Sequence, residues 1–323
     1  MISKPSNVEI FGPLEVGRAN EVMVESGHRH RISLVPNVRR VRASLAPAGD
    51  TLCESWPRFQ IPGRLLRQRP GLSARITGLS QYTSHFPETG RTYENQHGGT
   101  NMGTMIELKS ADGHTFSAYR CEPAAKPRGG LVVVQEIFGV NSHIRAVADA
   151  YAADGYLVVA PAIFDRAKRG YETGYAQPDI EAGVAIMQGL KWDNTLADIA
   201  AAVQSAKAGG KVGIVGYCYG GAVAWMAASR VPGLACAVPY YGGAVPNLIG
   251  EQPKCPVMFH WGETDHSIPL EAAKKVAAAH PQAMSHYYKA GHGFNCDQRG
   301  SYHAESSKLA RERTVEFLRK HLG

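Results

Sequence analysis

A cysteine between two glycines occupies the position in this sequence best suited to nucleophilic chemistry. Cys218 is the centre of the segment GYCYG at 216–220, which follows a short apolar run and precedes a run of small residues. A G-x-nucleophile-x-G turn between a strand and a helix lifts the nucleophile above the sheet, because the glycines allow a very tight turn. The start of the following helix would also favour a thiolate. The alternative is a small buried thiol, since cysteine is among the most buried residue types.

Two further side chains that could assist a nucleophile follow later apolar runs. Asp265 lies in a loop directly after one run, where Glu263 and His266 compete with it by residue type alone. His292 lies between two glycines after the next run. Each alone could be a solvated loop residue. Together, the three side chains follow the chain order nucleophile, acid, histidine. This order predicts that His292 is the base for Cys218 and that Asp265 orients His292.

A fourth candidate, Glu136, ends an apolar run and leads into Ile137. In sheets with this type of turn, the corresponding loop supplies the second backbone N–H of an oxyanion hole. We therefore predict that the N–H groups of Ile137 and Tyr219 hold a developing oxyanion. A buried carboxylate is costly unless it is paired. Glu136 is thus expected either to take part in the reaction or to accept hydrogen bonds from loop amides.

After residue 105, apolar runs typical of strands alternate with helical patterns, which predicts the α/β class with a mainly parallel sheet covered by helices on both faces. Such sheets carry their sites at the carboxyl ends of the strands. Asn194 is placed to cap a helix whose apolar residues form one stripe. The predicted strands are 105–109, 114–121, 131–134, 156–160, 211–215, 235–241, 256–261 and 285–289. The other predicted helices are 143–154, 221–229, 270–280 and 303–321.

The first hundred residues differ from the rest of the chain. They contain 13 Lys or Arg and 8 Asp or Glu, a net charge of +5, whereas residues 101–323 contain 22 and 20, a net charge of +2. Turn-forming residues interrupt this segment, and it has little helical or strand periodicity. An accessory domain and a targeting tail are alternatives, but a transit peptide should be poor in acids. We expect residues 1–100 to be a disordered extension or not part of the native protein, with translation starting at Met102 or Met105.

Composition and charge exclude several classes of function. No apolar run is long enough to span a bilayer, and the first thirty residues lack the apolar stretch of a signal peptide. The six cysteines form no CxxC pair, so we expect reduced thiols in the cytoplasm and no metal site. The net charge of +7 lies mainly in the first hundred residues, and no aromatic-interleaved basic stripe accompanies it. We expect neither a nucleic-acid partner nor a membrane partner.

Four segments, taken in order, resemble motifs of the dienelactone hydrolase family: QEIFGVN at 135–141, GYCYGG at 216–221, GETDHSIP at 262–269 and GHGF at 291–294. The resemblance covers residues 105–323 and implies an α/β-hydrolase fold. It further implies a triad of Cys218, Asp265 and His292, with Glu136 holding the resting thiol and helping to form the thiolate when substrate binds. The implied reaction opens an enol-lactone to a keto acid, without metal or cofactor.

The residues that would contact substrate are less well defined. The family places an arginine a few residues after the histidine to bind a substrate carboxylate, whereas the nearest arginine here is Arg299. Arg166 or Arg169 could substitute for the family's other carboxylate-binding arginine, and a solvated basic loop is the alternative. Phe138 and Tyr241 are candidates for walls of the pocket, or are simply part of the core.

The sequence thus predicts a cysteine-dependent hydrolase that opens a lactone or cleaves an activated ester. A thioesterase or acyltransferase with the same triad is one alternative. A non-catalytic redox sensor, in which Cys218 is oxidised to a sulfenic acid, is another. We expect a small-molecule lactone or ester as the partner, no cofactor, and a monomer or weak homo-oligomer.

Overall fold

The computed structural model describes residues 103–323, together with the backbone of five short strands nearer the N-terminus. The chain divides into two units, Met1–Glu94 and Asn95–Gly323. In the first unit the described strands pair antiparallel, in the orders β1-β2-β5 and β3-β4. The prediction of a dispensable extension over residues 1–100 falls largely outside the described residues and stays a prediction. These strands are β1 (Asn7–Glu9), β2 (Arg42–Leu45), β3 (Arg58–Ile61), β4 (Arg64–Arg67) and β5 (Leu72–Arg75).

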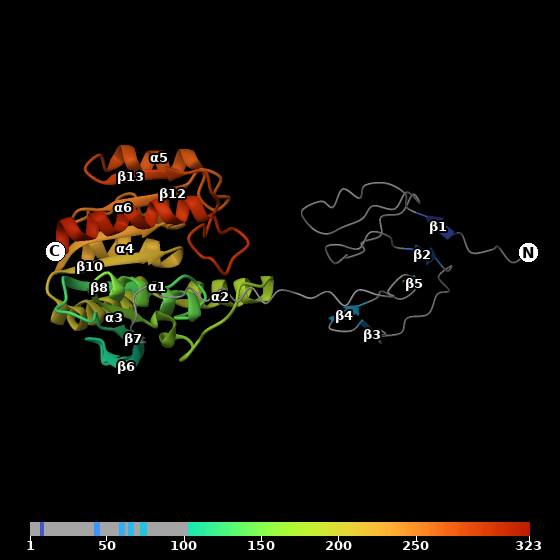
Figure 1. The fold of residues 1–323 in the computed structure, drawn as a ribbon, viewed down its shortest axis with the longest axis horizontal. Helices are drawn as coiled ribbons and strands as arrows, with labels where there is room; N and C mark the ends of the chain where they lie inside the picture. Colours follow the sequence, from blue (N-terminus) through green and yellow to red (C-terminus); the bar gives the residue numbers. More distant parts are fainter. Residues whose placement is uncertain (1–6, 10–41, 46–57, 62–63, 68–71, 76–102) are drawn as a thin grey trace, which may run out of the picture. The chain divides into compact units, whose positions relative to one another are not determined.

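An eight-stranded sheet forms the centre of the second unit, and its strands follow one another from β13 to β6 down the unit in Figure 1. The order is β13-β12-β11-β10-β8-β9-β7-β6. The pairs β6–β7 and β7–β9 are antiparallel and the other pairs are parallel, so the predicted α/β class is confirmed. The strands are β6 (Thr104–Lys109), β7 (Thr115–Cys121), β8 (Gly129–Val134), β9 (Tyr156–Pro161), β10 (Val212–Tyr217), β11 (Leu234–Tyr240), β12 (Met258–Gly262) and β13 (Met284–Tyr288).

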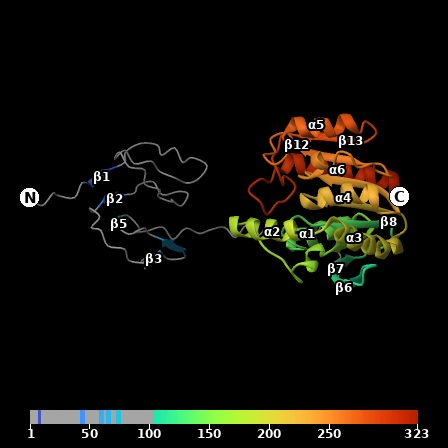
Figure 2. The same ribbon diagram turned by 180° about the vertical axis from the view of Figure 1, so that it is seen from behind.

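Helices cover both faces of this sheet. Helices α3 and α4 contact each other and pack on strands β8–β11, whereas α6 packs on β10–β12 and is joined to the end of α1 by an ion pair between Arg311 and Asp154. Helix α6 lies in front of the sheet in Figure 1, and α4 comes forward in the reverse view of Figure 2. The helices are α1 (Ser142–Ala153), α2 (Gln177–Gly189), α3 (Trp192–Ala206), α4 (Tyr219–Arg230), α5 (Leu270–Ala279) and α6 (Ala304–Leu322). The short 3₁₀ turns are η1 (Ile163–Arg166), η2 (Lys207–Gly209) and η3 (Val245–Leu248).

The central strands are buried along their whole length, which explains their unbroken apolar sequences. Every residue of β8, β9 and β10 is buried, as expected for parallel strands with helices on both faces. The carboxyl ends of β8, β10, β12 and β13 lead into the loops or turns that carry the candidate polar residues. The sheet therefore brings these segments to one edge.

Two local predictions need correction. Helix α3 begins at Trp192, so Asn194 lies inside its first turn and does not cap it. The ring of Trp192 packs 5.8 Å from the ring of Tyr219, and this contact favours a helix that begins at Trp192 rather than after Asn194. Helix α2 was not predicted, although Ile180, Val184 and Met187 lie on one face and pack, partly buried, against the core.

Within the part of the chain that the structure describes, no helix is both long and apolar enough to cross a bilayer. The cytoplasmic location and the monomeric or weakly associated state remain predictions.

Candidate active site

Cys218 occupies a strained turn between β10 and α4. Its backbone angles are φ 54° and ψ −114°, in the left-handed half of the map that residues other than glycine rarely adopt. The turn is held from two sides, because the N–H of Cys218 donates to the carbonyl of Tyr240 at 3.1 Å and the N–H of Gly220 donates to the carbonyl of Gln135 at 3.1 Å. Such strain persists only where the surrounding structure enforces it, and it is typical of functional sites. The side chain of Cys218 stays half-buried and reachable.

The glycines beside Cys218 are required by close backbone contacts. A Cβ atom on Gly216 would lie 1.9 Å from the carbonyl oxygen of Gly220. A Cβ atom on Gly220 would lie 2.5 Å from the carbonyl oxygens of Gln135 and Val134. The turn can therefore pack against β8 only if both positions lack a side chain.

His292 and Asp265 complete a chain of contacts that begins at the sulfur. The Nε2 atom of His292 lies 3.1 Å from Sγ of Cys218, and its Nδ1 atom lies 2.8 Å from Oδ2 of Asp265. In its protonated form the ring donates to both partners. The structure thus brings together the three residues that the sequence pattern singles out.

The loop fixes the carboxylate of Asp265 through backbone donors. Its Oδ1 atom accepts from the N–H of Ser267 at 2.7 Å and from the N–H of Ile268 at 3.1 Å, which leaves Oδ2 for His292. Asp265 is buried, whereas Glu263 and His266 in the same loop are exposed. Burial therefore separates Asp265 from the two competing candidates.

The charges around His292 favour its protonated form. Burial alone would lower the pKa of this imidazole, but the charge of the Cys218 sulfur and the hydrogen bond to Asp265 raise the pKa to about 10. The ring should then carry a proton throughout the neutral range. A protonated His292 stabilises a thiolate on Cys218, which is the reactive form of a cysteine nucleophile.

We expect Cys218→Ala to lower the pKa of His292, because the substitution removes the sulfur that stabilises the imidazolium. In the unmodified protein the ring should remain protonated at pH 8 and lose its proton only as the pH approaches about 10. Titration of the ¹⁵N shifts of the imidazole measures both midpoints. Equal midpoints in the two proteins would contradict a charged sulfur beside the ring.

Two backbone N–H groups near the sulfur are free to bind an oxyanion. Among the residues that the structure describes, no acceptor pairs with the N–H of Ile137 or of Tyr219. Tyr219 is the first residue of α4, and Ile137 lies in the loop after β8. The bond from Gly220 to Gln135 joins the two segments, so the donors are held together.

Glu136 is buried and paired with Arg299. The Nη1 atom of Arg299 donates to Oε1 of Glu136 at 2.9 Å, and only 2% of the Glu136 side chain is exposed. The guanidinium also lies over the ring of Phe138, 5.4 Å from its centroid. The resemblance implies that Glu136 holds the resting thiol, but here Arg299 binds Glu136 while His292 contacts Cys218.

The two predicted arginines, Arg166 and Arg169, make their recorded contacts with residues other than the triad. Arg166 makes a paired contact with the buried Asp198, at 2.7 and 2.8 Å, and a third contact with Asp112 at 2.8 Å. Arg169 binds Glu107 on the edge strand β6 at 2.7 Å. Their guanidinium groups are held by carboxylates along β6, its turn and α3, and their assignment as substrate ligands stays a prediction.

The two predicted aromatic residues pack tightly beside the site. Phe138 is 1% exposed and lies edge-on to Tyr175, with ring centroids 4.6 Å apart. Tyr241 is fully buried and lies edge-on to His292, with centroids 5.2 Å apart. Both residues belong to the core and also border the polar residues of the site. Packing in the core and forming a wall of the pocket are therefore compatible roles for them.

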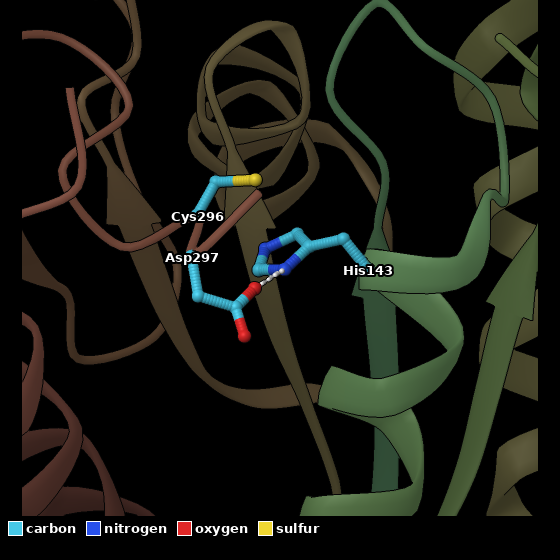
Figure 3. A group of neighbouring side chains, drawn as sticks. All are labelled: His143, Cys296 and Asp297. Atoms are coloured by element: carbon cyan, nitrogen blue, oxygen red, sulfur yellow. Dashed lines mark hydrogen bonds and ion pairs between the residues drawn. The ribbon is translucent and has the colours of Figure 1, made fainter. Parts of the chain in front are cut away.

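One cluster of potential metal ligands lies near these residues. Atoms of His143, Cys296 and Asp297 that could bind a metal lie within 4.8 Å of one another (Figure 3). Burial and then the charge of Glu136 raise the pKa of Cys296 to about 12, and Cys296 shares a hydrogen bond with Tyr175. Asp297 pairs with Nδ1 of His143 at 3.1 Å, and we interpret the cluster as a tie between α1 and the loop before α6.

Reasoning from the sequence missed the role of Arg299. The resemblance directs attention to an arginine closer to His292 in sequence. Nothing in the sequence between His292 and Arg299 shows that this loop folds back and brings Arg299 to Glu136. Tyr175 was also missed, although it hydrogen-bonds to Asn141 and lies 6.0 Å from the Arg299 guanidinium. An aromatic residue in a polar loop is a weak signal by itself.

The contacts of Cys218, His292 and Asp265 suit nucleophilic chemistry at the sulfur. Comparison with known proteins finds similar hydrolases. A carboxymethylenebutenolidase of Pseudomonas putida is 34% identical over an alignment of 224 residues, and the match covers 66% of this chain and 94% of that protein. A crystal structure from Klebsiella pneumoniae, provisionally described as a dienelactone hydrolase, is 29% identical with a TM-score of 0.57 and covers 66% of this chain and 98% of that one.

A second solved structure shows the same fold. It is a promiscuous, dienelactone hydrolase-like phosphotriesterase from metagenomic libraries, 21% identical with a TM-score of 0.58, and it covers 69% of this chain and 100% of that one. The sequence profile of the dienelactone hydrolase family itself matches residues 116–322. This chain therefore belongs to the dienelactone hydrolase family.

Proposed function

We propose that this protein is a cysteine-dependent hydrolase that opens lactones or cleaves activated esters, with Cys218 as the nucleophile. One observation carries the proposal: Sγ of Cys218 lies 3.1 Å from His292, whose other ring nitrogen lies 2.8 Å from Asp265. A nucleophile, a base and a group that orients the base, in contact in this order, form the arrangement that activates cysteine.

The first half of the reaction forms a thioester. The thiolate of Cys218 attacks the carbonyl carbon, and the negative charge moves to the carbonyl oxygen. The N–H groups of Ile137 and Tyr219 donate to that oxygen. Losing one such donor typically costs about 2.7–4 kcal/mol of transition-state stabilisation. The carbon–oxygen bond of the substrate then breaks, and His292 can supply a proton to the departing oxygen.

The second half releases the acid. Once the sulfur is acylated it carries no charge, so His292 loses the partner that raises its pKa and can act as a base. His292 takes a proton from water, the hydroxide attacks the thioester, and the thiolate departs. A thiolate leaves more readily than an alkoxide, so unactivated alkyl esters should be poor substrates. Enol esters and enol-lactones suit this chemistry, since their leaving group is a stabilised enolate.

The pair of Glu136 and Arg299 points to a substrate that carries a carboxylate. A substrate carboxylate can replace the carboxylate of Glu136 on the guanidinium, because arginine can bind a carboxylate through one or two of its N–H donors. This exchange would free Glu136 for the role beside Cys218 that the family resemblance implies. The curated relative from Pseudomonas putida is a carboxymethylenebutenolidase, which supports a carboxylated enol-lactone as the substrate class.

We expect Arg299→Lys to lower kcat/KM for dienelactone by about tenfold, because lysine keeps the charge but loses the forked pair of donors. Hydrolysis of p-nitrophenyl acetate, which has no carboxylate, should change little. The measurement is initial-rate kinetics on both substrates. Arg166→Lys is the matched control and should leave both rates unchanged, since Arg166 is held by Asp198 and Asp112.

Three results would oppose this proposal. An equal loss on both substrates would show that Arg299 supports the fold of the site rather than the carboxylate. If Arg166→Lys lost activity on dienelactone but not on p-nitrophenyl acetate, Arg166 rather than Arg299 would be the residue that binds the substrate carboxylate. Failure of the unmodified enzyme to hydrolyse any lactone or activated ester would contradict the function itself. The same substrates, tested on a chain that starts at Met102, examine our proposal that residues 1–100 are not needed for catalysis.

A further inference from the structure

The hydroxyl of Tyr241 is a buried donor without a partner. The side chain is fully buried, and its oxygen makes no hydrogen bond within the part of the chain that the structure describes. Leaving a buried polar group unpaired lowers the stability of the protein. Most buried polar groups in proteins are paired, so an exception calls for a physical reason.

The surrounding structure holds the ring and the backbone of Tyr241 in place. The ring of Tyr241 lies edge-on to those of His292 and Phe294, with centroids 5.2 Å away in each case. Its backbone has φ 34°, the second positive φ of a residue other than glycine among the described residues. The N–H of Tyr241 donates to the carbonyl of His260 at 2.9 Å, which fixes this conformation. Strain and an unpaired donor thus coincide on one residue.

The charged groups that act on the Tyr241 hydroxyl belong to the candidate active site. Burial, and then the negative charges of Glu136 and of the Cys218 thiolate, raise the pKa of Tyr241 well above its usual value, while Arg299 opposes them. The hydroxyl therefore remains protonated at every working pH and can only donate toward an anion. Its charged neighbours are the nucleophile and the two members of the ion pair.

We propose that the Tyr241 hydroxyl is a substrate-binding donor, which hydrogen-bonds the substrate carboxylate that Arg299 receives. This proposal rests on the proposed function and adds a second donor to its carboxylate site. In the free enzyme Glu136 occupies the guanidinium and the hydroxyl stays unpaired. When the substrate carboxylate enters, its two oxygens can accept from Arg299 and from Tyr241 together. The strain at Tyr241 then holds the donor ready for an anion.

Tyr156 provides a matched control for this hydroxyl. It is also fully buried with an unpaired hydroxyl, but it begins β9, and its charged neighbours include Arg319, Asp154 and Arg128. Both Tyr→Phe changes remove one buried, unpaired oxygen. Only the change at Tyr241 should affect the substrate.

The test measures dienelactone binding by calorimetry in the Cys218→Ala background, which prevents turnover. Adding Tyr241→Phe should weaken binding by about tenfold or more, as expected for a hydrogen bond to a charged group, whereas adding Tyr156→Phe should not. In the active enzyme, Tyr241→Phe should lower kcat/KM for dienelactone several-fold more than for p-nitrophenyl acetate, which carries no carboxylate. Its thermal midpoint should be unchanged or higher, because an unpaired polar atom is lost.

Each contrary result has its own meaning. Unchanged affinity in the Tyr241→Phe background overturns the proposal. An equal loss on p-nitrophenyl acetate overturns it in favour of an effect through His292. A lower thermal midpoint overturns it by showing that the hydroxyl already has a partner in the free protein. If Cys218→Ala binds no dienelactone while the unmodified enzyme hydrolyses p-nitrophenyl acetate, the carboxylated substrate class fails, and this role of Tyr241 fails with it.

Discussion

Cys218→Ser is expected to lower kcat for esters and lactones by about 10³-fold or more, because the members of a catalytic triad act as a unit. The serine hydroxyl titrates far above a thiol, so His292 would lose the anionic partner that raises its pKa. Initial rates on p-nitrophenyl acetate and dienelactone measure the effect.

Cys255→Ser is the matched control for this substitution. Cys255 is also a half-buried free thiol, and burial raises its pKa to about 11. It has no contact with the triad that the structure records, so both rates should stay near those of the unmodified enzyme. Full activity in Cys218→Ser, or an equal loss in Cys255→Ser, would refute the assignment of the nucleophile.

Gly216→Ala is expected to abolish activity and to reduce the free energy of unfolding by about 3 kcal/mol or more, at the upper end of overpacking effects. The new Cβ would lie 1.9 Å from the carbonyl oxygen of Gly220, which is backbone and cannot swing aside. Relieving the clash must move the turn that carries Cys218 and, through the bond from Gly220 to Gln135, the oxyanion loop. Urea unfolding and initial rates measure the two effects.

Gly189→Ala makes the same chemical change without the clash. Gly189 ends α2, and a Cβ there would meet no atom within 4 Å. Alanine is the better helix former, so this variant should be as stable as the parent or slightly more stable, with unchanged activity. A Gly216→Ala protein with normal stability and full activity would show that the turn can relax, contrary to its observed packing.

The sequence was sufficient to predict the sheet and the order of the candidate triad, because both depend on local patterns. Unbroken apolar runs such as Val132–Val134 can be stable only between two layers of helices, and the structure buries them completely. The GYCYG segment predicted a tight turn, and Cys218 adopts a positive φ there. The choice of Asp265 over Glu263 could not follow from residue type. It depends on which side chain the folded loop buries beside His292.

Contacts between distant segments could not be predicted in this way. Arg299 meets Glu136 across 163 positions of sequence, through a loop without periodicity. The sequence offered Arg166 and Arg169 as candidates, and nothing in it shows that Arg166 lies against the buried Asp198. The unpaired hydroxyl of Tyr241 is likewise a property of the packed core, since every tyrosine carries a donor but few lack an acceptor.

The most direct test of the proposed chemistry is to identify the acylated residue during turnover. Rapid acid quenching of the unmodified enzyme with p-nitrophenyl acetate, followed by mass spectrometry of its peptides, should find an acetyl group on the peptide that carries Cys218. In Cys218→Ser that acetyl thioester should be absent. An acetyl group on another residue of a turning-over enzyme, or steady hydrolysis by Cys218→Ser at the rate of the parent, would contradict a cysteine hydrolase centred on Cys218.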